Sequence, residues 1–76
     1  MIGEYAMDNI TPEKTTAAER AAINNYTRCG GNERNGWVML ADILRRFDDA
    51  NLPAALVYWG FARPASADKL AAKLRA

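Results

Sequence analysis

Apolar residues recur at helical spacing over residues 37–50, and this is the clearest pattern in the chain. At about 100° per residue, one helix face collects five apolar side chains, namely Trp37, Leu40, Ala41, Leu44 and Phe47. Met39 and Ile43 widen this face, and an arc that broad is typical of a helix with two neighbours. We therefore expect this helix to be central, with Asp42 pairing with Arg45 and Arg46 on its narrow polar face.

A helix is also predicted before the glycine pair Gly30 and Gly31, which favours a helix end. Two start signals compete: Thr11, Pro12 and Glu13, or a capping box from Thr16 to Glu19. The predicted inward face consists of Ala18, Ala22, Tyr26 and Cys29. Residues 32–36 are expected to form the most mobile internal loop, because glycine and asparagine dominate them.

Two shorter helices are predicted in the last third of the chain. Pro53 suits the first turn of a helix that extends to about residue 61. This stretch has no polar face, and its Val, Tyr, Trp and Phe residues leave a strand as the alternative. Ser66 is expected to cap the last helix, whose inward positions are Ala67, Leu70, Ala71 and Leu74.

These elements predict an all-α fold, a small single domain of about four short helices packed around the helix at residues 37–50. A chain of 76 residues is long enough for one core. We divide it into an N-terminal arm at residues 1–10, without convincing periodicity, and a helical domain at residues 11–76.

Charge and composition favour a cytoplasmic protein without a membrane association. The net charge is +1, and no apolar run approaches the length of about 20 residues that spans a bilayer. The N-terminus lacks the basic start and apolar stretch of a signal peptide. A single cysteine excludes an internal disulfide and favours a reducing compartment.

The sequence offers no catalytic, cofactor or metal site, so we expect no enzymatic activity. Histidine is absent, and the carboxylates fall at solvated helix positions. Cys29 lies on the apolar face of its helix and is expected to be a buried structural residue. No Gly-Lys-Ser/Thr pattern follows Gly30 and Gly31, which excludes a phosphate-binding loop of that type.

The aromatic cluster Tyr58, Trp59 and Phe61, followed by Arg63, is the strongest candidate for a binding surface. Trp, Tyr and Arg are enriched at binding hot spots. The alternative is that all three aromatic side chains belong to the core. The polar face of the 37–50 helix adds Arg45 and Arg46 as further candidates for contact with a partner.

We therefore expect a non-catalytic protein–protein interaction module that occludes or modulates a larger protein partner. A complete protein of this size fits inhibitors carried by phages and mobile elements, of the anti-CRISPR or host-takeover type. A homodimeric assembly factor is a further alternative.

The main alternative is a small helical DNA-binding transcriptional regulator. The basic residues at positions 45, 46, 63, 69, 73 and 75 would form its surface if they converge. Two helices joined by a tight turn after residue 50 match helix-turn-helix spacing, and the run NGWVMLADIL at residues 35–44 resembles the start of some winged-helix domains. The apolar outer face of the helix at 53–61 argues against base recognition, so nucleic acid is the less favoured partner.

Overall fold

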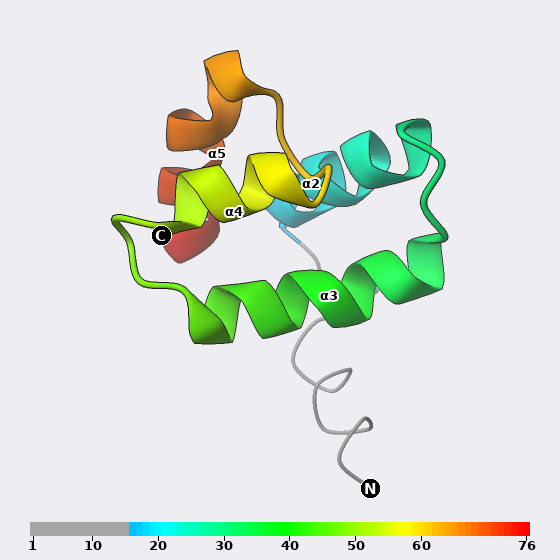
Figure 1. The fold of residues 1–76 in the computed structure, drawn as a ribbon, viewed down its shortest axis with the longest axis horizontal. Coiled ribbons are helices and arrows are strands. Elements are labelled where there is room, and N and C mark those ends of the chain that lie inside the picture. Colours follow the sequence, from blue (N-terminus) through cyan, green and yellow to red (C-terminus); the bar gives the residue numbers. More distant parts are fainter. Residues whose placement is uncertain (1–15) are drawn as a thin grey trace, which may run out of the picture.

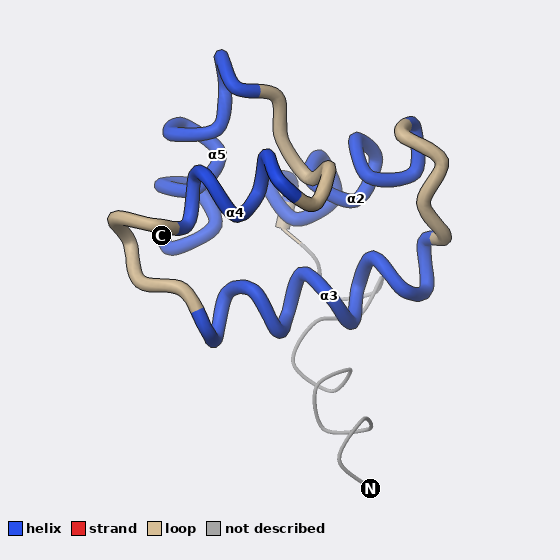
Figure 2. The backbone as a smooth tube through the Cα atoms, in the orientation of Figure 1, coloured by secondary structure: helices blue, strands red, loops and turns tan. Residues whose placement is uncertain are grey.

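The structure, a computed structural model, describes residues 16–76 of the chain. Within this range the regular elements are helices and no strand occurs, so the predicted all-α fold is confirmed (Figure 2). The elements are α2 (Ala17–Arg28), α3 (Glu33–Arg46), α4 (Leu52–Tyr58), the 3₁₀ turn η2 (Pro64–Ser66) and α5 (Ala67–Arg75). The predicted arm at residues 1–10 and the predicted helix start at Thr11 lie outside the described residues.

The four helices enclose one hydrophobic core. Helix α3 packs against α2 and α4, while α5 packs against α4 and α2, as the arrangement in Figure 1 shows. Helix α3 therefore has two neighbours, as its wide apolar arc predicted. The largest fully buried side chains come from α2, α3, α4 and the segment after α4. They are Ile23, Leu40, Leu52, Leu56 and Phe61.

Helix α3 is shifted toward the N-terminus relative to its predicted range. Asn32 caps it by accepting a hydrogen bond from the backbone N–H of Asn35 at 3.2 Å, and Glu33 occupies the first turn. The prediction of a loop at residues 32–36 was therefore wrong, because the asparagine that favoured a loop acts as an N-cap. Helix α3 also ends at Arg46, with Phe47 as its C-cap, rather than near residue 50.

The C-terminal end of α3 is held by a residue from the end of the chain. The guanidinium of Arg75 donates hydrogen bonds to the backbone carbonyls of Leu44 and Phe47 and forms an ion pair with Asp49 at 3.0 Å. Carbonyls in the last turn of a helix lack partners within the helix, and a cation there also complements the helix dipole. Arg75 thus fixes the end of α5 against the end of α3.

Helix α2 starts at the second of its two predicted positions, with a complete capping box between Thr16 and Glu19. Ala22 and Ile23 are fully buried, as expected for the face that meets α3. Cys29, however, is exposed, and its prediction as a buried structural residue was wrong. The helix ends one residue earlier, so Cys29 does not continue the apolar face.

Tyr26 organises the junction between α2, α3 and the segment after α4. Its ring stacks on Phe61 with centroids 4.7 Å apart and an interplanar angle of 9°. Its hydroxyl donates a hydrogen bond to the Met39 sulfur at 3.4 Å. The ring also lies against the backbones of Gly31 and Gly36, where a Cβ atom would lie 2.3 Å and 2.8 Å from the nearest ring carbon. Both glycines are therefore required for close approach to the ring.

A charged pair also links α2 to α3. The carboxylate of Glu33 accepts hydrogen bonds from Trp37 at 3.3 Å and from Arg20 at 3.2 Å. The Arg20 guanidinium lies 5.2 Å from the centroid of the Trp37 ring, within the range of a cation–π contact. The hydrogen bonds from Trp37 and Arg20 lower the pKa of the Glu33 carboxyl from its ordinary value of 4.5.

The segment at residues 52–58 is the helix α4, so the strand alternative was wrong. Gly60, at φ +88°, reverses the chain after it, and Asn25 of α2 donates a hydrogen bond to the Gly60 carbonyl at 2.9 Å. Ser66 stands at the N-cap position of α5 without making a side-chain cap, contrary to prediction. Its hydroxyl instead donates to the Arg63 carbonyl, closing η2.

Candidate functional site

The exposed aromatic pair Tyr58 and Trp59 marks the first candidate surface. Tyr58 is 78% exposed and Trp59 is 37% exposed, and they are the large hydrophobic residues that the described part of the chain leaves open to solvent. The two rings meet edge to face with centroids 4.6 Å apart. The ring centroid of Trp59 lies 5.8 Å from that of Phe47, and this contact holds Trp59 against the end of α3. Tyr58 therefore projects into solvent beside the Trp59 ring, which is held in place by Phe47.

A shallow apolar depression of about 430 Å³ adjoins this pair. Pro53, Ala54, Val57 and Tyr58 of α4 form one side, and Pro64, Ala67 and Asp68 form the other. We call the pair and this depression the aromatic surface. An apolar surface with a protruding tyrosine is suited to contact with another protein, because it offers buried area together with a hydroxyl for a hydrogen bond.

The structure separates the residues that the sequence grouped as one surface. Phe61 is fully buried and stacks on Tyr26, so it belongs to the core and does not form part of the exposed surface. The cause is the chain reversal at Gly60, which turns Phe61 inward. Arg45 and Arg46 pair with Asp42 on α3, at 3.3 Å and 3.0 Å.

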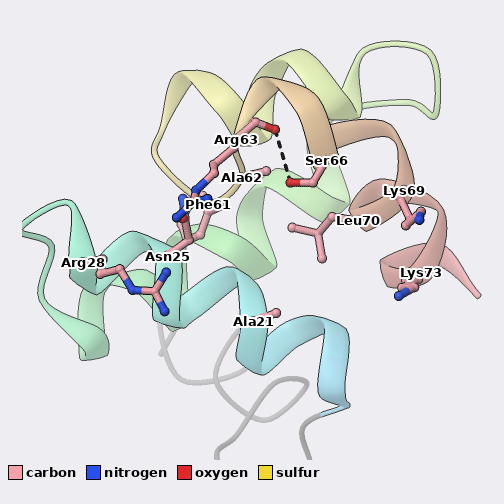
Figure 3. A pocket seen from close by; sticks show the side chains of 10 residues that line it. All are labelled: Ala21, Asn25, Arg28, Phe61, Ala62, Arg63, Ser66, Lys69, Leu70 and Lys73. Atoms are coloured by element: carbon pink, nitrogen blue, oxygen red, sulfur yellow. Dashed lines mark hydrogen bonds between the residues drawn. The ribbon is translucent and has the colours of Figure 1, made fainter.

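Arg63 lies on a second surface, a cleft of about 330 Å³ between α2, η2 and α5. Figure 3 shows Arg28 of α2 on one side of this cleft and Lys69 and Lys73 of α5 on the other, with Leu70 between them. Arg63 extends from the segment before η2. We call this the basic cleft, defined by the four cationic residues Arg28, Arg63, Lys69 and Lys73.

The basic cleft brings together only part of the predicted basic surface. Of the six basic residues considered for a DNA-binding surface, Arg63, Lys69 and Lys73 line the cleft. Arg45 and Arg46 pair with Asp42 instead, and Arg75 contacts the end of α3. Arg28 was missed as a member of this group. Nothing in the sequence pattern indicated that α5 would pack beside α2, the helix that carries Arg28.

The cleft residues are free of ion pairs. All four cations are exposed, and none of them forms a salt bridge within residues 16–76. No acidic side chain lines the cleft. The floor is apolar and comes from Ala21, Phe61, Ala62 and Leu70. The cleft can therefore attract anionic groups while covering apolar ones.

The described residues contain no arrangement suited to metal binding. No three His, Cys, Asp or Glu side chains gather at one place in residues 16–76. The same range has no buried polar or charged side chain. What these surfaces offer is contact area and charge.

No family model, curated protein or solved structure matches this chain. Among the described helices, none is long and apolar enough to cross a membrane.

Proposed function

We propose that this chain is a non-catalytic protein–protein interaction module that acts by occluding or modulating a larger partner. The observation that carries the proposal is the exposure of Tyr58 and Trp59, whereas the other large apolar side chains of residues 16–76 are buried or partly buried. Aromatic side chains that are truncated at the centre of an interface cost about 2 kcal/mol or more of binding free energy.

The chemistry of the aromatic surface favours a protein over nucleic acid. The outer side of α4 presents Ala54, Val57 and Tyr58. Apart from the Tyr58 hydroxyl, it offers none of the Arg, Lys, Asn or Gln side chains that commonly read base edges in the major groove. A helix-turn-helix regulator would need such side chains on its second helix. The narrower expectation of a phage or mobile-element inhibitor rests on chain length and stays a prediction.

Affinity capture from an extract of the source cells tests the proposal. We expect wild-type protein to retain one larger protein in stoichiometric amount, and Tyr58→Ala to lose it while keeping the wild-type circular dichroism spectrum. Arg34→Ala is the matched control, because Arg34 is also exposed to solvent, lies on α3 and forms no ion pair in the described range.

Two results would contradict the proposal. One is equal capture by Tyr58→Ala and wild type, which would place the contact elsewhere. The other is a dimer of the wild type that Tyr58→Ala converts to a monomer in light scattering, since the aromatic surface would then bind a second copy of this chain.

A further inference from the structure

We propose that the basic cleft binds an acidic, partly apolar segment of a protein partner. This inference rests on the proposed function and adds the chemistry of the partner to it.

Among residues 16–76, the cations without an ion pair in that range are concentrated in the cleft. Among the described arginines and lysines outside it, all but Arg34 have a carboxylate in salt-bridge contact, in pairs of Arg20 with Glu33, of Arg45 and Arg46 with Asp42, and of Arg75 with Asp49. The cleft cations have no such partner within the part of the chain that the structure describes. Like charges gathered without counter-charges repel one another, and a carboxylate-bearing ligand relieves that repulsion. Arg28 and Arg63 can each bind a carboxylate through two parallel hydrogen bonds.

The floor of the cleft determines which acidic ligand fits. Ala21, Ala62 and Leu70 give the space between the cations an apolar base. A volume of about 330 Å³ is at the lower end of the range of about 300–1,000 Å³ that ligand pockets occupy. A ligand that matches both parts carries carboxylates around one or two apolar side chains. An acidic polypeptide segment has this composition, and a simple anion does not.

The cleft and the aromatic surface both border the turn η2. Both lie against η2: Arg63 and Ser66 line the cleft, whereas Pro64 lines the apolar depression. A protein that covers Tyr58 and extends past η2 would therefore reach the cleft. The two surfaces can contact one partner from the two sides of this turn.

Nucleic acid fits the cleft less well than an acidic segment does. Phe61 is fully buried and cannot stack on a base. The uncharged polar groups of the lining already have partners: the Asn25 amide donates to the Gly60 carbonyl, and the Ser66 hydroxyl donates to the Arg63 carbonyl. The lining therefore offers a nucleic acid its four cations, but neither an exposed aromatic ring nor a free uncharged donor.

Fluorescence anisotropy at physiological salt tests the cleft with a short fluorescein-labelled peptide of glutamate and leucine. We expect the wild type to bind this peptide, and Lys69→Glu to bind it at least about tenfold more weakly, which is about 1.4 kcal/mol. Arg63→Glu, outside the helices, should have the same effect and serves if Lys69→Glu does not fold. Arg34→Glu is the control: it changes the net charge equally, at an unpaired arginine away from the cleft, and should bind like wild type.

Two ligand controls separate the parts of the inference. A peptide with glutamine in place of glutamate, and one with alanine in place of leucine, should each bind more weakly than the original. A labelled thymidine oligonucleotide should also bind more weakly than the acidic peptide.

Several results overturn the inference. It fails if the wild type does not bind the peptide at all, or if Arg34→Glu weakens peptide binding as much as Lys69→Glu does. It also fails if the peptides without glutamate or without leucine bind as well as the original, or if the oligonucleotide binds more tightly than the acidic peptide. The last of these would make the cleft a nucleic-acid site. If peptide binding fails while capture still depends on Tyr58, only this inference is wrong. If the cleft binds the peptide while capture ignores Tyr58, the proposed function is wrong instead.

Discussion

The substitution Gly31→Ala tests the packing of Tyr26 most directly. A Cβ atom at Gly31 would lie 2.3, 2.5 and 2.7 Å from three ring carbons of Tyr26, closer than side-chain carbons approach one another. The ring cannot move away freely, because its face is stacked on Phe61 at 4.7 Å. Gly31 does not have a positive φ, so its backbone accepts alanine without strain and the effect isolates the clash. Overpacking of this kind costs about 1–3 kcal/mol.

Chemical denaturation of a double-mutant cycle provides the assay. Gly31→Ala should lower the free energy of unfolding in the wild type and have little effect in the Tyr26→Ala background, where the ring is gone. Gly30→Ala is the matched control. Gly30 has φ +96°, and a Cβ atom there would have no atom within 4 Å. Gly30→Ala should therefore lower the free energy of unfolding by about 1 kcal/mol through backbone strain, whether or not the Tyr26 ring is present. A Gly31→Ala protein as stable as wild type, or an equal loss in both backgrounds, would refute the described position of the Tyr26 ring.

Three further predictions concern stability. Arg75→Met should lower the free energy of unfolding by about 1–2 kcal/mol, because it removes the charged hydrogen bonds to the end of α3. The control Lys73→Met, at an exposed position without an ion pair in the described range, should stay within about 0.5 kcal/mol of wild type in urea titrations. Leu40→Ala should lower the free energy of unfolding by about 2–5 kcal/mol and Leu44→Ala should lower it less, because Leu40 is fully buried and Leu44 is half-buried. Equal losses of stability in the same titrations would contradict the described rotation of α3 about its axis. The pKa of Glu33 is lower in the folded chain than its ordinary 4.5, so the unfolded chain takes up this proton first and stability falls as the pH drops through the folded pKa. In denaturation from neutral to acidic pH, the free energy of unfolding should depend less on pH in Glu33→Gln than in wild type. An unchanged pH dependence would contradict the contacts of Glu33 with Trp37 and Arg20.

The sequence predicted the helices because their signals are local. The capping box at Thr16, the apolar periodicity around Leu40 and the glycine at position 60 each act within a few residues, so they are visible without a fold. The errors came where one residue type supports two structures. Asn32 was assigned to a loop and acts as an N-cap, and Ser66 was assigned a capping role but stands at the end of a 3₁₀ turn.

The candidate surfaces were only partly predictable, because they depend on contacts between distant segments. The aromatic run at residues 58–61 has no polar positions that would show which ring points inward, and a single backbone reversal at Gly60 decides that Phe61 is buried. The basic cleft needs α5 beside α2, which places Arg28 opposite Lys69 and Lys73. Neither helix carries a sequence pattern that specifies this pairing.

Site-specific photo-crosslinking from position 58 tests the central claim most directly. A photoreactive phenylalanine analogue replaces Tyr58, and in a second protein it replaces Arg34 as the control, each expressed in the source cells and irradiated. The 78% exposure of Tyr58 leaves the ring able to reach a bound partner. The account predicts a covalent adduct with one larger protein from position 58 and none from position 34. No adduct from position 58, the same adduct from both positions, or an adduct only with a second copy of this chain would contradict it.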